Sequence, residues 1–404
     1  MCAPIGKLRE NSRLIQPLHF FSLYPFPFPA EPVMVEPLTV PMSKDDAQEL
    51  LLVFLPLPEP KEVIDSIRQQ FPTIEVAFVE IPPGTLEITD DVIPSDLLQR
   101  ATIMTTAFGV IPHPDQTPQL KYLHSFSAGV DHLINHPIFR DTKIRMSTSS
   151  GIHGPPIAEW VVMNWLVYSR MYTKILEAKS QQRWLTFKEV RQWEVDDHVG
   201  QTVGILGYGS IGRQVARAAS GLGMRVLVYT AQPRLTPESK RDTGFIIPGT
   251  GDPDGLIPEA WYSGRDKASL HNFLAQGLDH LVVSLPLNAG TTKLIGKEEL
   301  EILSAHCDST TRRPFLTNIS RGKVIDQDAL LSAMQSGALG GAALDVTDPE
   351  PLPVGHPLWE QPNVHIGSHM SAFGKRYWER SLEILRLNLT RIREGEELIN
   401  EYHR

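Results

Sequence analysis

Short apolar runs alternate with polar or amphipathic stretches along the chain from about residue 42. An apolar run at 51–55 (LLVFL) is followed by 61–70, where apolar residues recur at helical spacing, and then by a second run at 74–79. Apolar runs of this length predict buried strands, and the helical spacing between them predicts a helix. Further extended runs are predicted at 103–108 and 122–126.

A second series of the same kind begins at residue 202. Predicted strands lie at 202–206, 224–230, 281–285, 315–319 and 341–346, and predicted helices at 211–222, 327–336 and 377–393. Between the two series, residues 157–178 are apolar without strand-like alternation, and they predict one long helix. Strands that alternate with helices are typical of parallel sheets. We therefore predict an α/β fold with two such sheets.

The composition is that of a large globular chain. Its 404 residues suggest two or three domains, and 41% of them are apolar, so a large core can form. The net charge of −9 argues against a protein that binds nucleic acid through its phosphates. The two cysteines, Cys2 and Cys307, exclude a disulfide framework and a cysteine-rich zinc site, and they fit a reducing compartment.

Proline is concentrated at the start of the chain. Eight of the 33 prolines fall in the first 41 residues, where Pro25 and Pro27 prevent the aromatic stretch 20–28 from forming a helix. We predict that residues 1–41 are an N-terminal extension; the alternative is an organelle presequence, which the sparse arginines disfavour. No apolar run approaches the roughly 18 residues of a membrane span, so we expect a soluble, cytoplasmic protein.

A glycine-rich loop stands between a predicted strand and a predicted helix. Residues 207–212 read GYGSIG, a G-x-G-x-x-G pattern. Here Gly207 permits a tight turn, Gly209 lets a pyrophosphate approach the backbone, and Gly212 allows the helix to pack closely on the strand. The loop predicts a dinucleotide site at the helix N-terminus, made of Gly207, Tyr208, Gly209, Ser210, Ile211 and Gly212. A methyltransferase with the same first glycines is the alternative.

The end of the next predicted strand lacks the acidic residue that binds the ribose hydroxyls in NAD enzymes. Residues 229–234 read YTAQPR. This stretch has no carboxylate to repel a 2′-phosphate, whereas Thr230 can donate a hydrogen bond to that phosphate and Arg234 can pair with it. We therefore predict a preference for NADP(H), with NAD(H) as the alternative. Taken alone, Arg234 also fits a solvated loop residue.

Six motifs besides the glycine loop resemble the family of D-isomer-specific 2-hydroxyacid dehydrogenases. They are 125–133 (SFSAGVDHL), 149–160 (SSGIHGPPIAEW), 283–296 (VSLPLNAGTTKLIG), 318–326 (NISRGKVID), 343–353 (ALDVTDPEPLP) and 363–371 (NVHIGSHMS). The resemblance covers about residues 45–400. It implies two Rossmann-like domains, flavodoxin-like and dinucleotide-binding, each a doubly wound parallel sheet, with an interdomain cleft. The substrate domain would be residues 42–158 plus 371–404, and the dinucleotide-binding domain residues 159–370.

The resemblance implies three catalytic residues. Arg321 suits recognition of a carboxylate and a carbonyl, and His369 would be the proton donor and, in reverse, the base. Glu350 would pair with His369, raise its pKa and orient the ring. The backbone amides around Ala128 and Gly129 would hold the substrate carboxylate. Further implied cofactor contacts are Leu285, Pro286, Thr292, Ile319, Ser320, Ser371 and Asp345, the last accepting a bond from the nicotinamide carboxamide.

Two histidine pairs raise the question of a metal site. His365 and His369, like His132 and His136, have the H-x-x-x-H spacing of two ligands on one turn of a helix. Gly367 and the extended stretch before it argue against a helix at the first pair, and neither pair has the glutamate of an H-E-x-x-H motif. We predict no metal and assign His365 to a strand.

Two stretches depart from the family pattern. Residues 240–267 and 306–313 (HCDSTTRR) are additional, and we expect both to be surface excursions, the first with simple surface packing. Cys307 in the second stretch is expected to be inert.

Together these patterns predict an NAD(P)-dependent D-2-hydroxyacid dehydrogenase, acting as a reductase of a small 2-oxo acid such as glyoxylate or hydroxypyruvate. Because the family is usually dimeric, we expect a homodimer, with no nucleic-acid or membrane partner. The alternative is a nucleotide-sensing interaction protein of the co-repressor kind, which retains the same three catalytic residues. A formate dehydrogenase is disfavoured, since that branch carries an amide where Glu350 stands.

Overall fold

Two parallel sheets with their helices make up the described chain. The computed structural model describes residues 49–85, 87–106, 110–130, 133, 135–193, 196–307 and 313–403. The predicted extension at 1–41 lies outside these residues. In the described part, no helix is long and apolar enough to cross a membrane.

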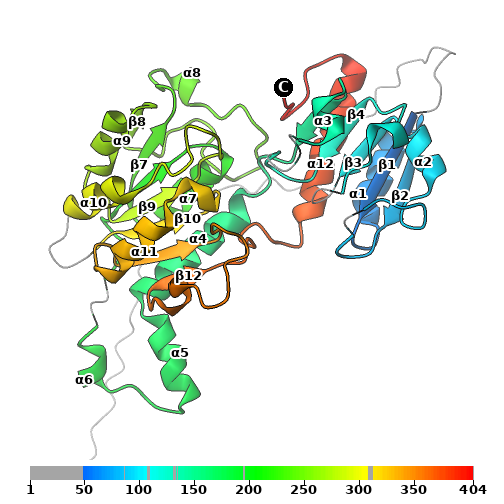
Figure 1. Cartoon of the computed structure of the whole chain (residues 1–404). Helices are drawn as coiled ribbons and strands as arrows, with labels where there is room; N and C mark the ends of the chain where they lie inside the picture. The colour runs from blue at the N-terminus through cyan, green and yellow to red at the C-terminus, as the bar shows by residue number, and fades with distance from the viewer. Residues whose placement is uncertain are drawn as a thin grey trace, which may run out of the picture. The chain divides into compact units, whose positions relative to one another are not determined.

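The first sheet has five parallel strands in the order β2-β1-β3-β4-β5. This is the strand order of flavodoxin-like doubly wound sheets, and it confirms the prediction. The strands and their connecting helices (Figure 1) are β1 (Glu49–Leu55), α1 (Lys61–Gln70), β2 (Ile74–Glu80), α2 (Ser95–Arg100), β3 (Ile103–Thr106), the 3-10 turn η1 (Pro114–Gln116), β4 (Tyr122–Ser125), α3 (Pro137–Arg140) and β5 (Arg145–Thr148).

A helix from the end of the chain, α12 (Tyr377–Glu394), completes the core of the first sheet. Its buried Leu382, Leu385 and Leu389 lie in one hydrophobic cluster with Leu51 of β1 and Ile64 of α1. Their spacing of three and four residues is the apolar stripe that the sequence predicts. The first sheet is therefore covered on one face by a segment more than 200 residues away along the chain.

The second sheet has seven parallel strands in the order β12-β11-β10-β9-β6-β7-β8. The order runs outward in both directions from β6 and β9, as in dinucleotide-binding Rossmann sheets, which confirms the second predicted domain type. Its elements are β6 (Thr202–Leu206), α7 (Ser210–Gly221), β7 (Arg225–Thr230), α8 (Pro237–Lys240), β8 (Ala260–Ser263), α9 (Lys267–Leu274), β9 (His280–Val283), α10 (Lys297–Ala305), β10 (Phe315–Asn318), η2 (Gly322–Val324), α11 (Gln327–Gln335), β11 (Gly341–Leu344), η3 (Pro357–Glu360) and β12 (Val364–Ile366).

Besides elements that the sequence analysis did not predict, such as β5, α9 and α10, two stretches differ from its prediction. Residues 157–178 belong to two helices, α4 (Gly154–Ser169) and α5 (Tyr172–Ser180), because Met171 adopts a left-handed conformation with φ of 50°. The uniform apolar composition hides this break. The strand β8 lies inside the stretch 240–267 and pairs with β7, so the prediction of a surface excursion is wrong for this part. Its four half-buried residues are too few to reveal a strand by alternation.

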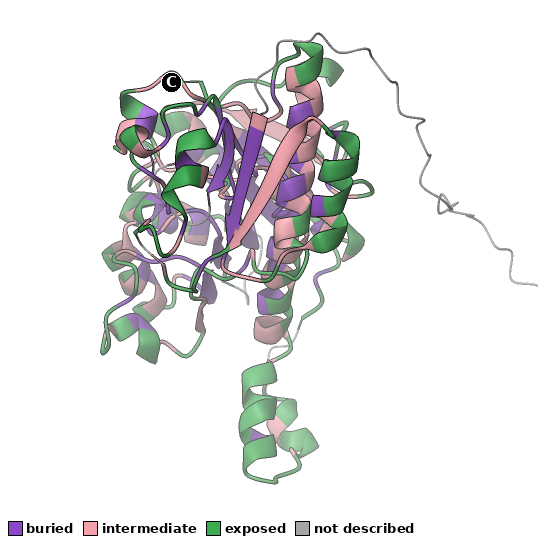
Figure 2. Ribbon diagram, turned by 90° about the vertical axis from the view of Figure 1, so that its right-hand side faces the viewer, coloured by how far each residue is buried: buried purple, intermediate pink, exposed green. Residues whose placement is uncertain are grey.

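Helices α5 and α6 (Phe187–Val190) and the loop between them are mostly exposed (Figure 2). Apolar side chains nevertheless lie on this segment, which we call the 172–190 arm. Trp184 is 93% exposed and Phe187 is 81% exposed. Exposed apolar patches can mark interaction sites.

A buried histidine links the first sheet to α12. His124 on β4 is fully buried, with Nδ1 2.8 Å from the Ser147 hydroxyl and Nε2 3.1 Å from the Ser381 hydroxyl. Burial lowers the pKa of His124 from 6.5 to about 3. The folded protein therefore keeps this ring neutral where an unfolded chain would protonate it.

We expect His124 to make the protein acid-sensitive. Above pH 6.5 the ring is neutral in both the folded and the unfolded chain, and the folded state has its full stability. As the pH falls from 6.5 toward 3, the ring is protonated in the unfolded chain but stays neutral in the folded chain, so the free energy of unfolding decreases. The slope is at most about 1.4 kcal/mol per pH unit. Urea unfolding of wild type and His124→Gln at pH 7, 6 and 5 measures it. Identical slopes for the two proteins would rule out this role.

Candidate active site

The glycine-rich loop lies between β6 and α7, and its three glycines have three different surroundings. Gly207 has a φ of 94°, and a Cβ there would lie 2.3 Å from the Ser284 carbonyl oxygen. A Cβ on Gly212 would lie 2.2 Å from the Gly207 carbonyl oxygen. By contrast, a Cβ on Gly209, the N-cap residue of α7, would have no neighbouring atom within 4 Å. This open cradle at a helix N-terminus fits the pyrophosphate of a dinucleotide.

The cradle lies where the strand order of the second sheet reverses. β6 pairs with β7 on one side and with β9 on the other, and open α/β sheets bind ligands at such a point, beyond the carboxyl ends of the strands. Leu285 and Pro286 follow β9 there, and the Leu285 side chain lies 3.2 Å from the Cβ position of Gly207. Thr292 is exposed, and its hydroxyl donates to the Asn288 carbonyl.

The side chain of Tyr208 is not free to contact a ligand. Tyr208 is 6% exposed, and its hydroxyl donates to Asp252 Oδ2 at 2.7 Å. Only its backbone therefore belongs to the predicted cofactor site. Ser210 and Ile211, the first residues of α7, are half-buried beside it.

Thr230 and Arg234 lie at and just beyond the end of β7. The Thr230 hydroxyl donates to the Gln232 carbonyl at 2.7 Å, and Arg234 Nη1 donates to the Ser239 carbonyl at 2.7 Å. Arg234 is exposed, and the Ser239 bond fixes one edge of its guanidinium, which has five N–H donors in all. The remaining donors are available to an anion at this strand end.

One cavity of about 620 Å³ gathers most of the predicted substrate residues. Its wall includes Ala128 and Gly129 after β4, Arg321 after β10 and His369 after β12. Ile211, Ile319, Ser320, Asp345 and Ser371 also line it. The loops that follow the carboxyl ends of strands from both sheets thus line one cavity. Residues such as Ala128 and His369 meet there although more than 240 positions separate them, so sequence spacing alone cannot show that they are neighbours.

His369 and Glu350 form a pair at this cavity. His369 Nδ1 lies 2.6 Å from Glu350 Oε1, and both side chains are partly exposed. His369 has a left-handed backbone with φ of 55°, and its N–H donates to the Asp345 carbonyl at 2.9 Å. With Nδ1 bound to the carboxylate, Nε2 is the ring atom left to exchange a proton with a substrate.

Asp345 has a structural role that the sequence did not reveal. It is 4% exposed, and its carboxylate accepts from the backbone N–H groups of Met370 at 3.0 Å and Ser371 at 3.1 Å and from the Ser371 hydroxyl. These bonds fix the residues that follow His369. Asp345 therefore holds the His369 loop, in addition to any contact with a cofactor.

Arg321 is placed by close packing of two loops. Its Nη1 donates to the Ser320 carbonyl at 2.9 Å. The next residue, Gly322, lies so near the loop after β11 that a Cβ would be 1.9 Å from the Thr347 carbonyl oxygen. A side chain at 322 would separate the loop that carries Arg321 from the loop that carries Glu350.

The stretch 240–257 is anchored to α7 by buried polar groups. Arg213, 4% exposed, donates to the Asp252 and Lys240 carbonyls at 2.5 and 2.7 Å. Asp252, 6% exposed, also accepts from the backbone N–H groups of residues 256 and 257. The Phe245 carbonyl oxygen approaches Gly151 so closely that a Cβ on Gly151 would lie 2.2 Å away. Simple surface packing is thus wrong for this stretch as well.

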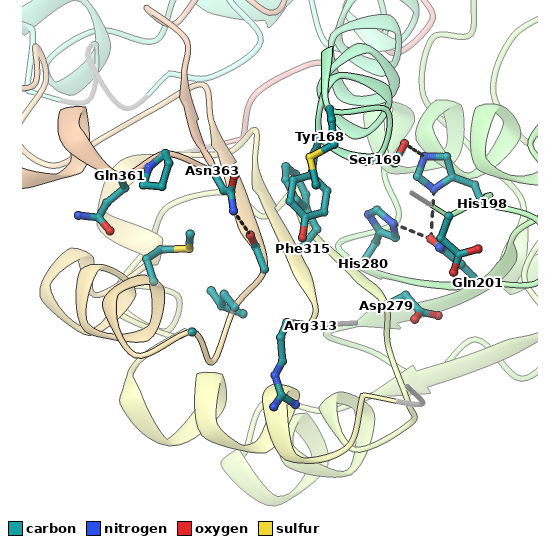
Figure 3. Close-up of a pocket in the computed structure, with 17 residues that line it drawn as sticks. Tyr168, Ser169, His198, Gln201, Asp279, His280, Arg313, Phe315, Gln361 and Asn363 are labelled. Atoms are coloured by element: carbon teal, nitrogen blue, oxygen red, sulfur yellow. Dashed lines mark hydrogen bonds between the residues drawn. The ribbon is translucent and has the colours of Figure 1, made fainter. Parts of the chain in front are cut away.

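A second cavity of about 360 Å³ lies at the opposite end of the second sheet (Figure 3). Gln201, His280 and Phe315 line it; Gln201 directly precedes β6, and His280 and Phe315 are the first residues of β9 and β10. His198 and His280 both contact Gln201 Oε1, at 3.1 and 3.0 Å. Because ligands of such sheets bind beyond the carboxyl ends, we do not assign the reaction to this cavity.

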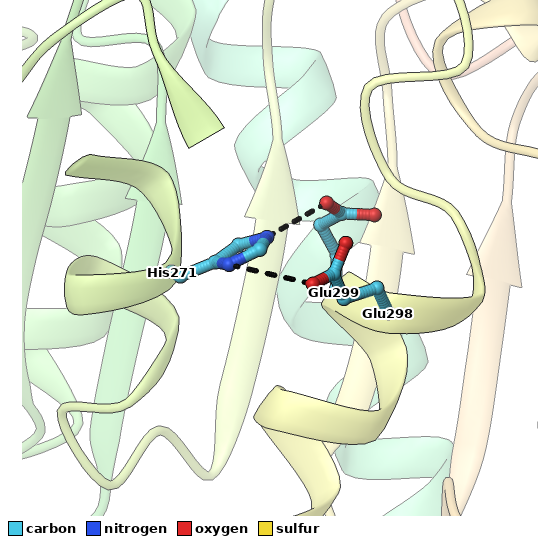
Figure 4. Close-up of side chains that lie close together, drawn as sticks. All are labelled: His271, Glu298 and Glu299. Carbon is cyan, nitrogen blue, oxygen red and sulfur yellow. Dashed lines mark hydrogen bonds and ion pairs between the residues drawn. The ribbon is translucent and has the colours of Figure 1, made fainter. Parts of the chain in front are cut away.

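One histidine–carboxylate cluster in the described part resembles a metal site. His271, Glu298 and Glu299 converge between α9 and α10 (Figure 4), with His271 Nε2 2.9 Å from Glu299 Oε1. However, Lys267 Nζ lies 3.1 Å from Glu298 and 3.3 Å from Glu299. Glu299 also accepts from the Gly296 N–H at the start of α10. A lysine already supplies the positive charge here, and we interpret the cluster as a contact between two helices.

Three of the four histidines in the H-x-x-x-H pairs lie among the described residues, and each has a protein partner. His365 Nδ1 lies 3.0 Å from Asn164 Oδ1, and His369 bonds to Glu350. His136 caps α3 by accepting from the Ile138 N–H. His132 lies outside the described residues.

The sequence and fold are similar to those of known 2-hydroxyacid dehydrogenases. The sequence model described as "D-isomer specific 2-hydroxyacid dehydrogenase, NAD binding domain" matches residues 162–245 and 256–371, so the match is interrupted within the anchored stretch. A human glyoxylate reductase/hydroxypyruvate reductase is 31% identical over 255 residues, which are 62% of this chain and 68% of the relative. A glyoxylate reductase from Korarchaeum cryptofilum is 26% identical over 85% of this chain and 93% of its own length.

Solved structures show the same fold. An NADPH-dependent glyoxylate/hydroxypyruvate reductase from Sinorhizobium meliloti, in complex with NADP and sulfate, superposes with a TM-score of 0.64 at 22% identity and covers 88% of this chain and 98% of its own. A D-isomer specific 2-hydroxyacid dehydrogenase family protein from Aeromonas salmonicida has a TM-score of 0.63 at 24% identity, with 88% and 99% covered.

Proposed function

Because this chain belongs to the D-isomer specific 2-hydroxyacid dehydrogenase family, we propose that it reduces a small 2-oxo acid such as glyoxylate or hydroxypyruvate, with NADPH as the preferred cofactor. The family makes it an NAD(P)-dependent oxidoreductase. The proposal about the reaction rests above all on the His369–Glu350 pair, because His369 lines the same cavity as Arg321. A proton donor and a carboxylate-binding cation at one cavity are what reduction of a 2-oxo acid requires.

Each residue then has a distinct task. The bound nicotinamide supplies the hydride that reaches C2. The guanidinium of Arg321 and the backbone amides at Ala128 and Gly129 hold the substrate carboxylate, and Arg321 also polarises the carbonyl. His369 gives a proton from Nε2 to the C2 oxygen, while Glu350 accepts from Nδ1–H and keeps the ring in the orientation that this transfer needs.

The residues of the glycine loop would hold the cofactor. The N–H groups at the start of α7 face the open cradle at Gly209, where they can bind the pyrophosphate. Leu285 and Pro286 would flank the adenosine side of the crevice, and Ile319, Ser320, Asp345 and Ser371 line the cavity where the nicotinamide would lie. We keep Thr292 as a peripheral cofactor contact.

The function is tested by turnover. Purified protein is mixed with NADPH and a panel of glyoxylate, hydroxypyruvate and pyruvate, and the loss of absorbance of the reduced cofactor is followed. We expect turnover of at least one of these acids, with formation of the D isomer from hydroxypyruvate or pyruvate and of achiral glycolate from glyoxylate. Cofactor binding without turnover of any 2-oxo acid would favour a nucleotide-sensing protein instead.

We expect Arg234 to set the cofactor preference. The Arg234→Ala variant loses the cation nearest a 2′-phosphate, so kcat/KM for NADPH should fall by about tenfold or more while kcat/KM for NADH changes little. Arg241→Ala removes another exposed arginine, at the end of α8, and serves as the control. A wild-type preference for NADH, or an equal loss with both cofactors, is incompatible with this assignment.

We propose the domain limits that the sequence predicts, with residues 42–158 plus 371–404 binding the substrate and residues 159–370 binding the dinucleotide. All five strands of the first sheet fall in the former, and all seven of the second sheet in the latter. The change between domains then falls at α4, whose Val161 and Trp165 share a core cluster with β6. We place the protein in the cytoplasm, as the low cysteine count suggests.

We also propose a homodimer whose partner copy covers the 172–190 arm. The exposed Trp184 and Phe187 support this, because a second copy would remove both from water. Wild-type protein should sediment as a dimer, and the double variant Trp184→Asp, Phe187→Asp as a monomer. A wild-type monomer at micromolar concentration would refute the proposal.

A further inference from the structure

His153 lies in the motif 149–160 and lines the cavity, but the proposed mechanism gives it no role. It precedes α4 and lines the same cavity as Arg321 and His369. It stands close to the substrate amides in the fold, because the loops after β4 and β5 are joined by a bond from the Ser149 N–H to the Ser127 carbonyl at 3.0 Å. His153 therefore belongs to the wall that a small substrate would touch.

The imidazole of His153 is buried and has an unused polar atom. His153 is 6% exposed, and its Nδ1 has no hydrogen-bond partner among the described residues. The ring packs edge-on against Tyr377, with the ring centroids 5.1 Å apart. A buried polar atom without a partner is unfavourable, and a ligand group that bonds to it removes the penalty.

The ring is held in its neutral form. Burial, with a smaller effect of the Arg380 charge, lowers the pKa of His153 to about 4. A neutral imidazole offers one donor and one acceptor but no charge. It therefore suits a hydroxyl group better than a second carboxylate.

Three other hydroxyl side chains of the cavity already have protein partners. The Tyr377 hydroxyl donates to the Phe126 carbonyl at 2.7 Å, the Ser320 hydroxyl donates to Asn318, and the Ser371 hydroxyl donates to Asp345. Arg321 and His369 are needed for the carboxylate and the carbonyl. Besides the Ser127 hydroxyl, this leaves His153, whose Nδ1 is a buried atom without a partner among the described residues, to bond to the rest of the substrate.

We propose that His153 is a specificity-determining residue that hydrogen-bonds a hydroxyl on C3 of the substrate. The protein would thus prefer 2-oxo acids with a C3 hydroxyl, such as hydroxypyruvate, over the matching acids with a C3 methyl, such as pyruvate. The inference rests on the proposed function, because it places a 2-oxo acid in this cavity. A site that bonds a substrate hydroxyl discriminates strongly against an analogue that lacks it.

The test compares three substrates in four proteins. kcat/KM is measured for hydroxypyruvate, pyruvate and glyoxylate with wild type, His153→Leu, His153→Asn and His153→Gln. Wild type should prefer hydroxypyruvate over pyruvate by at least about tenfold. His153→Leu should lower that ratio at least about tenfold, chiefly through hydroxypyruvate, while Asn or Gln restores part of it. Glyoxylate has no C3, so its kcat/KM should change by less than about threefold.

The outcomes separate the two proposals. If glyoxylate or pyruvate is reduced but wild type does not favour hydroxypyruvate, or if the ratio is the same in His153→Leu, the inference about His153 is overturned and the proposed function stands. If none of the three acids is reduced, both are overturned. Melting curves show whether the leucine variant folds. If it does not fold, the wild-type ratio of kcat/KM for hydroxypyruvate over pyruvate still tests the inference, because a ratio near one overturns it.

Discussion

The His369→Asn variant is expected to lose about 10²–10⁴-fold in kcat for reduction of a 2-oxo acid, the usual contribution of a general acid. Asparagine removes the proton that the ring gives to the substrate. It also tolerates the left-handed backbone, with φ of 55°, that residue 369 adopts. The loop held by Asp345 should therefore stay in place, and the dissociation constant of NADPH, measured by fluorescence titration, should not change.

A nearby histidine provides the control for this variant. His365 lies on β12, and its ring bonds to Asn164 rather than to the cavity residues. His365→Asn should retain kcat within a few-fold of wild type, as befits a residue outside the cavity. Glu350→Gln should fall between the two, because it keeps a hydrogen bond to Nδ1 but not the charge. Full activity of His369→Asn would remove this residue from the mechanism.

The Gly209→Asp variant is expected to abolish cofactor binding without harming the fold. Gly209 has ordinary backbone angles, open space around its Cβ position, and the N-cap place of α7, where aspartate is a preferred residue. Thermal stability should therefore stay the same or rise slightly. The new carboxylate would stand against the pyrophosphate, and repulsion of about 4 kcal/mol for charges about 4 Å apart raises the dissociation constant of NADPH at least about a hundredfold.

The same helix offers a matched control. Gly221 is the last residue of α7 and also has open space around its Cβ position. Gly221→Asp adds the same charge at the far end of the helix, where it should cost some stability by the helix dipole but leave NADPH binding unchanged. Tight NADPH binding by Gly209→Asp would show that the pyrophosphate lies elsewhere.

The elements with a strong local signal were predicted well. α1 begins and ends at the predicted residues, and β6 matches its predicted range. Both have clear apolar patterns within a few residues. β8 was missed because an edge strand of four half-buried residues has no such pattern. The break between α4 and α5 at Met171 was missed because the apolar pattern of the sequence does not indicate that one residue adopts a left-handed backbone conformation.

The active-site residues to which the sequence motifs assign a role were predicted, and the others were not. His369, Glu350 and Arg321 were found because they lie in short ordered motifs, and the structure brings them to one cavity or one ion pair. The anchoring of Asp252 by Arg213 joins residues 39 positions apart, and no spacing rule connects them. His153 was overlooked for another reason: its significance depends on its burial and on an Nδ1 atom without a partner among the described residues, and both arise only in the folded chain.

The position of α12 has a consequence for how the protein is made. The strands of the first sheet leave the ribosome early, but Leu382, Leu385 and Leu389, which cover Leu51 and its neighbours, are synthesised almost last. At about 5–20 residues per second, the more than 200 residues between β5 and α12 take about 10 s or longer to make. Throughout that time the apolar face of the first sheet is covered by α1 but lacks α12, so part of it stays exposed and we expect a chaperone to bind the nascent chain until translation ends.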